Sequence, residues 1–86
     1  MATMRAWVVD GTGTPAEVLD LRRLEVPDPP PGFLRVRVAA AAVGLPDVLM
    51  CRGSYPLTPD QPFTPGQEMV GTATAVGDGL DADLIG

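Results

Sequence analysis

The fold is decided by one stretch, Pro62-Phe63-Thr64-Pro65-Gly66-Gln67-Glu68-Met69-Val70-Gly71-Thr72-Ala73-Thr74-Ala75-Val76-Gly77. In it, turn residues are followed by a carboxylate and then by an apolar segment that contains glycine. We predict that residues 69–76 form a strand. Successive side chains of a strand point to opposite faces, so one face of this strand would carry mainly small residues. That face would let another backbone pack closely, and it consists of Met69, Gly71, Ala73 and Ala75.

The neighbouring segments predict a mainly β layout with one short helix. In residues 33–38, aliphatic side chains alternate with Phe or Arg, which is the period of a half-buried strand. Residues 46–52 fit one or two helical turns, because Pro46 and Asp47 suit a helix start and Gly53 suits the position after its end. Residues 55–65 contain four prolines, which predicts an irregular loop.

Two motifs carry a resemblance to a known family. The stretch quoted above resembles the P-x-x-P-G-x-E-x-x-G-x-V-x-x-V-G signature of medium-chain dehydrogenases/reductases. Residues 38–47, followed by Gly53-Ser54-Tyr55-Pro56, resemble the A-x-x-V-N-x-x-D motif of that family with its downstream G-x-Y-P. Together they are similar to the zinc-free, quinone-oxidoreductase branch, the zeta-crystallin-like proteins.

The resemblance covers nearly the whole chain and implies its architecture. Residues 4–9 correspond to an opening strand, residues 11–15 to a hairpin loop and residues 18–26 to the return strand. The implied fold is a GroES-like small β-barrel, with residues 1–86 as the incomplete N-terminal catalytic domain of a larger α/β enzyme. No G-x-G-x-x-G turn follows a strand in these residues, so we expect the Rossmann domain to be absent from them.

The metal ligands of the zinc-dependent members are replaced in this sequence. Those members bind catalytic zinc through a Cys three residues before the motif Asp and a His before the motif Glu; Gly44 and Gln67 stand at these positions. The sequence contains no histidine, and catalytic zinc usually needs three protein ligands. We therefore predict that the chain holds no metal.

The resemblance implies four residues of a substrate and nicotinamide pocket. The Gln67 amide could donate to a substrate oxygen, or could bond loop backbone instead. Asp47 matches the family Asp near the nicotinamide, but it is also a first-turn acid that a helix dipole favours. Gly44 replaces the family Asn and so removes a donor. Tyr55 is either a pocket wall or a loop-packing aromatic.

Three further residues are predicted to be buried. Glu68 is followed at once by an apolar strand, so we expect a buried structural acid with a charged partner or a raised pKa, not a catalytic base. Cys51 lies among Val48, Leu49 and Met50, which favours core packing over a reactive thiol. Trp7, in the opening strand, is assigned to the core for the same reason.

Composition limits the classes of partner. The net charge is −5 and the six basic residues, all arginine, are scattered, which argues against nucleic acid as a partner. No apolar run approaches the roughly 20 residues of a membrane span. Cys51 is the single cysteine, so no disulfide can form within the chain. We expect a cytoplasmic protein.

The resemblance implies an activity for the full-length enzyme. It would be a zinc-independent, NADPH-dependent oxidoreductase that reduces quinones or activated alkenes by hydride transfer, with a quinone or enone as substrate and a homodimer as its assembly. The 86-residue chain alone is expected to be inactive. The alternative is a non-enzymatic, truncated GroES-like β-barrel that acts as a relic or an interaction module.

Overall fold

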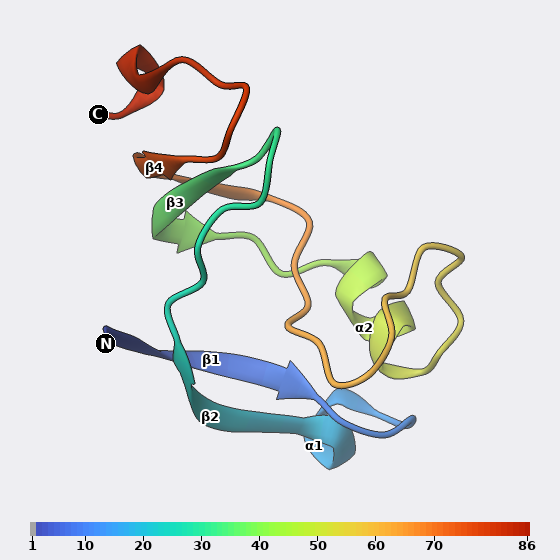
Figure 1. The fold of residues 1–86 in the computed structure, drawn as a ribbon. Helices are drawn as coiled ribbons and strands as arrows, with labels where there is room; N and C mark the ends of the chain where they lie inside the picture. Colours follow the sequence, from blue (N-terminus) through green and yellow to red (C-terminus); the bar gives the residue numbers. More distant parts are fainter. Residues whose placement is uncertain (1) are drawn as a thin grey trace. The chain divides into compact units, whose positions relative to one another are not determined.

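The computed structural model describes residues 2–86, which are mainly β with a few short helices (Figure 1). This class agrees with the expectation from the sequence, although more than one short helix is present. By contacts, the chain divides into two compact units. Unit 1 comprises the residues up to Glu25 together with Ala42–Glu68, and unit 2 comprises Val26–Ala41 with Met69–Gly86. The elements are β1 (Thr3–Val9), α1 (Pro15–Val18), β2 (Leu19–Glu25), β3 (Leu34–Ala41), α2 (Leu45–Cys51), β4 (Met69–Val76) and the 3-10 helix η1 (Ala82–Leu84).

Unit 1 contains an antiparallel ribbon of β1 and β2, paired from Thr3 opposite Glu25 to Val9 opposite Leu19. The connection between the two strands includes α1, where a simple hairpin loop was expected. Glu17 explains this helix: its Oε1 accepts from the backbone N–H of Thr14 at 3.2 Å and from the Thr14 hydroxyl at 2.7 Å. A capping box of this kind satisfies donors at a helix start, so it supports even a helix of four residues.

A cluster of buried side chains forms the core of unit 1. Val9 is fully buried and Cys51 is 1% exposed, as predicted for Cys51. The other members are Val18, Met50 and Phe63. Val9 and Phe63 also exchange backbone hydrogen bonds of 2.7 and 3.2 Å, so the long loop adds a β-bridge to β1.

The prediction that Trp7 belongs to this core is wrong, because its side chain is 54% exposed. Trp7 lies opposite Leu21 on the ribbon, two rungs from the Val9 and Leu19 pair that reaches the cluster. Val9 is therefore buried because it packs with α1, α2 and the loop at the end of the ribbon, whereas Trp7 lies farther along the ribbon.

The irregular loop predicted for residues 55–65 is confirmed, and a single side chain fastens it to the β1–α1 turn. Gln61 Oε1 accepts from the Gly11 N–H at 2.7 Å, while Gln61 Nε2 donates to the Gly11 carbonyl at 2.5 Å. Thus the Gln61 carboxamide pairs with both polar groups of Gly11, as a neighbouring strand would. Nearby, the Gly13 N–H donates to the Cys51 carbonyl at 2.9 Å.

Unit 2 is built on the antiparallel pair of β3 and β4, whose register shifts after Arg35 and again after Val38. A Cβ at Gly71 would collide with the carbonyl oxygen of Arg37 and would lie 2.8 Å from Val36 Cγ1. The predicted close backbone approach on the small face of β4 is therefore confirmed at Gly71. Within residues 2–86, no helix is both long and apolar enough to cross a membrane.

Candidate functional site

The first part of the site is the start of α2, where Asp47 fastens Gly44. The Asp47 Oδ2 accepts from the backbone N–H of Gly44 at 2.9 Å, and the Asp47 N–H donates to the Gly44 carbonyl at 3.2 Å. Asp47 is thus a helix-capping acid. Its second oxygen, Oδ1, is buried and has no hydrogen-bond partner among the described residues, which is unusual for a buried polar atom.

The second part is the segment that contains Gln67. Gly66 has φ of 146°, a conformation that glycine adopts at no steric cost, and it turns the chain just before Gln67. The Gln67 side chain is exposed, and within residues 2–86 its amide makes no hydrogen bond to the loop backbone. A free carboxamide offers two donors and an acceptor to a ligand.

A backbone hydrogen bond brings these two segments side by side. The Ala42 N–H donates to the Glu68 carbonyl at 3.1 Å. Gly44 follows Ala42 by two residues and Gln67 directly precedes Glu68, so both lie within a few Cα spacings of this bond. The two positions that correspond to zinc ligands in the resemblance therefore belong to adjacent segments of unit 1.

Tyr55 packs against the core cluster of unit 1 and is half-buried. Its carbonyl accepts from the Thr58 N–H at 3.1 Å and from the Thr58 hydroxyl at 2.5 Å. These backbone contacts fix the loop at Tyr55, while its side chain packs against the core. This packing agrees with the loop-packing role, and the role as a pocket wall stays a prediction.

The expectation of a buried carboxylate at Glu68 is wrong. Glu68 is exposed, as are Met69 and Val70 after it, which are 54% and 63% exposed. It is the backbone carbonyl of Glu68 that is engaged, by Ala42. An exposed carboxylate keeps its hydration and needs no cationic partner.

The side chains of residues 2–86 form no group of three His, Cys, Asp or Glu that could hold a metal ion. The one thiol, that of Cys51, is a poor ligand precursor. Burial raises its pKa, and the negative charge of Asp47 raises it further, whereas metal binding requires the thiolate.

The start of α2 does not fit a phosphate group. Phosphate groups bind free backbone N–H groups at a helix start. At α2, the Gly44 N–H is already bonded to Asp47, whose carboxylate would repel a phosphate. The helix has only seven residues.

Sequence reasoning missed Gln61. Its contact with Gly11 joins positions 50 residues apart, and neither residue belongs to a motif. A glutamine in a proline-rich loop gives no local signal of its partner, so only the three-dimensional structure reveals this pairing.

Comparison with known proteins places these features in a family. The model of the alcohol dehydrogenase GroES-like domain matches residues 30–86. The chain belongs to this domain family and so to the medium-chain dehydrogenases/reductases.

Individual relatives agree with this assignment. Over 77 residues the chain is 36% identical to the mitochondrial enoyl-[acyl-carrier-protein] reductase of Bos taurus, covering 90% of this chain and 21% of that protein. It is 37% identical over 72 residues to an alcohol dehydrogenase of Moraxella sp. (strain TAE123), covering 79% and 21%. The crystal structure of human synaptic vesicle membrane protein VAT-1 homolog-like protein superposes with a TM-score of 0.79 at 35% identity, covering 91% of this chain and 25% of that one. The chain thus spans about a fifth of the length of the curated relatives it matches.

Proposed function

We propose that this chain forms the substrate side of an oxidoreductase that works without zinc and reduces quinones or activated alkenes, with NADPH as the hydride source. Relatives named as a reductase and a dehydrogenase support the reaction class. One observation supports a reaction without zinc: where zinc-dependent members have a histidine, this chain has Gln67, which is exposed and whose amide makes no hydrogen bond within residues 2–86.

In this proposal Gln67 takes over part of the role of a metal ion. When a quinone or a conjugated alkene is reduced, negative charge develops on its carbonyl oxygen. An amide N–H aimed at that oxygen stabilises the charge in the transition state. Conjugated substrates accept hydride readily, so a neutral donor can suffice where a Lewis acid would otherwise be needed.

Asp47 has a positioning role in the same proposal. Its two hydrogen bonds to Gly44 fix the segment that the Ala42–Glu68 bond joins to Gln67. A fixed backbone keeps a hydrogen-bond donor within the few tenths of an ångström that catalysis requires. NADPH would supply the hydride when bound, and its phosphates would be held outside the residues described here.

The experiment compares Gln67→Met with the wild type in the complete gene product. Met has a similar length and no donor, so kcat/KM for a benzoquinone or an enone should fall roughly tenfold to a thousandfold. Glu68→Gln is the matched control, because it alters an adjacent exposed side chain and should change the rate by less than about threefold.

Metal analysis of the same preparation completes the test. We expect far less than about one zinc ion per chain, since three protein ligands are not available at this site. Unchanged kinetics in Gln67→Met would reduce Gln67 to a surface residue, and stoichiometric zinc would remove the basis for a zinc-independent reaction.

A further inference from the structure

One face of the β1–β2 ribbon carries two arginines without carboxylate partners. Arg5 and Arg23 lie directly opposite each other on the paired strands, and both are exposed. Arg23 Nη1 donates to the Thr3 hydroxyl at 3.1 Å, but among residues 2–86 neither arginine lies within ion-pair distance of an acid. Like charges placed opposite each other on a sheet destabilise it.

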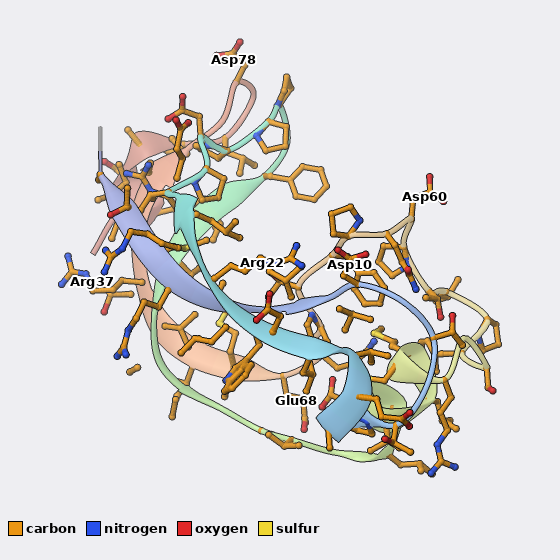
Figure 2. The ribbon with its side chains drawn as sticks, turned by 90° about the horizontal axis from the view of Figure 1, so that it is seen from below. Asp10, Arg22, Arg37, Asp60, Glu68 and Asp78 are labelled. Carbon is orange, nitrogen blue, oxygen red and sulfur yellow. The ribbon has the colours of Figure 1, made fainter. Side chains whose placement is uncertain are left out.

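The opposite face of the same ribbon shows the contrasting arrangement. Arg22 donates through Nη2 to Asp10 at 3.0 Å and through Nε to Asp20 at 2.8 Å (Figure 2). The chain has eleven acidic residues against six arginines. Acids are therefore plentiful, and Glu25 even shares the face of Arg5 and Arg23, but among residues 2–86 no acid forms an ion pair with either arginine.

Exposed apolar side chains continue this face toward the core. Residues at alternate positions of a strand share a face, so Trp7 and Leu21, which pair with each other, lie beside Arg5 and Arg23. Trp7 is 54% exposed and Leu21 is 46% exposed. We call these four residues the Arg–Trp face.

The chemistry of the Arg–Trp face selects one kind of partner. Small-molecule sites are concave pockets, whereas the Arg–Trp face lies on the open side of a two-stranded ribbon. Nucleic acid needs an extended, clustered basic surface, and two arginines do not form one. Arginine forks bind carboxylates in a bidentate manner, and Trp and Arg are enriched among the residues that dominate protein interfaces.

We propose that the Arg–Trp face is a docking surface for an acidic protein segment that presents an aliphatic side chain beside its carboxylates. The carboxylates would pair with Arg5 and Arg23, and the aliphatic group would cover Trp7 and Leu21. Docking would relieve the repulsion between the arginines and remove apolar surface from water.

The test titrates the complete gene product with a short synthetic peptide in which glutamates alternate with leucines. Calorimetry should show saturable binding that weakens as the salt concentration rises from about 50 to about 300 mM. The double variant Arg5→Gln/Arg23→Gln, and separately Trp7→Ala, should each weaken binding by roughly tenfold or more. A peptide with glutamine in place of every glutamate should not bind.

The chain offers a matched control in Arg52→Gln. Arg52 is also exposed and unpaired with acids among the described residues, but it lies at the end of α2, so its loss should change the affinity by less than about twofold. Circular dichroism verifies that each variant is folded.

Accessibility of Trp7 is measured separately by acrylamide quenching, with Trp7→Phe subtracted to isolate its emission. Efficient quenching is expected for an open face. Shielded Trp7 emission would mean that another part of the same polypeptide covers the face, and it would overturn the proposal. Absence of saturable binding, or binding that survives loss of both arginines, would overturn it as well.

Discussion

Each compact unit is stabilised internally by a different kind of contact. In unit 1, side chains from β1, α1, α2 and the loop meet in a cluster whose members are at most 9% exposed. In the described part of unit 2, no large apolar side chain reaches that degree of burial, and Phe33 is 64% exposed. Unit 2 relies instead on the β3–β4 ladder and on backbone approaches at Gly71 and Gly77, where added Cβ atoms would strike the carbonyls of Arg37 and Pro30.

This difference predicts which kind of substitution destabilises each unit most. A packed cluster loses dispersion contacts and hydrophobic burial when volume is removed. A ladder with touching backbones has little side-chain volume to lose, but it has no room for added atoms. Unit 1 should therefore be most sensitive to truncation, and unit 2 to enlargement of glycine.

The largest effect is expected for Phe63→Ala in unit 1. The loss of a buried aromatic should lower the free energy of unfolding by about 3–5 kcal/mol. Phe33→Ala in unit 2 is the matched control, with an expected loss of less than about 1 kcal/mol because its ring is exposed. Urea denaturation measures both. Similar losses of unfolding free energy at the two positions would contradict the inferred difference between the units.

Gly71→Ala should cause the next largest loss of stability. The added methyl group would have to displace the Arg37 carbonyl, which should lower the free energy of unfolding by about 1–3 kcal/mol. Gly44→Ala is the control, since its Cβ would find Pro46 Cδ at an ordinary 3.6 Å and its φ of −144° suits any residue. The same urea titrations decide the outcome, and a neutral Gly71→Ala would show that the ladder can adjust.

Gln61→Ala should have a smaller and more local effect on unit 1. The two bonds to Gly11 are exposed, so their loss should cost about 1 kcal/mol and should accelerate hydrogen exchange at the Gly11 amide. Gln67→Ala removes a carboxamide that makes no bond within the described residues and should leave both quantities unchanged. Exchange at Gly11 that is equally fast in the two variants would rule out the Gln61 contact in solution.

The smallest expected effect is a loss of stability at acidic pH that arises from Glu17 at the start of α1. Hydrogen bonds from the Thr14 side chain and backbone lower the pKa of Glu17. Because folding lowers the pKa of Glu17, this contact stabilises the fold at pH values above the pKa of an unperturbed glutamate in the unfolded chain, which is about 4.3. The contribution is lost as the pH falls through the lowered folded value. Glu17→Gln should flatten the stability profile slightly in that acidic range, as followed by thermal unfolding at several pH values.

The sequence predicted the elements that have a strong local pattern. Strands at residues 69–76 and 33–38 and a helix near residues 46–52 correspond to β4, β3 and α2, because alternation and turn residues act locally. The four-residue α1 was missed, since its capping box stabilises too few residues to produce a periodic signal. Trp7 and Glu68 were placed in the interior because apolar neighbours predict burial, whereas burial in this small chain depends on which elements close over each rung.

In the candidate site, too, local features could be predicted and contacts between distant residues could not. The Asp47 cap could be predicted from its place in the first turn and is confirmed by its bond to Gly44. The pocket roles of Gly44 and Gln67, which come from their motifs, stay predictions. The bond from Ala42 to Glu68, the pairing of Gln61 with Gly11 and the unpaired Arg–Trp face depend on contacts between distant parts of the chain. No local pattern encodes such contacts.

Neither compact unit is a continuous piece of chain, because each is assembled from two separate segments that alternate along the sequence. During synthesis, the β1–β2 ribbon can pair as soon as it leaves the ribosome, but Val9 and Val18 must wait for Phe63 before they are enclosed. Likewise β3 emerges well before its partner β4. Contacts between distant segments slow folding, and unpaired edges are vulnerable to aggregation while they wait. We therefore expect nascent chains that end before residue 63 to need chaperone protection, even though their first two strands are complete.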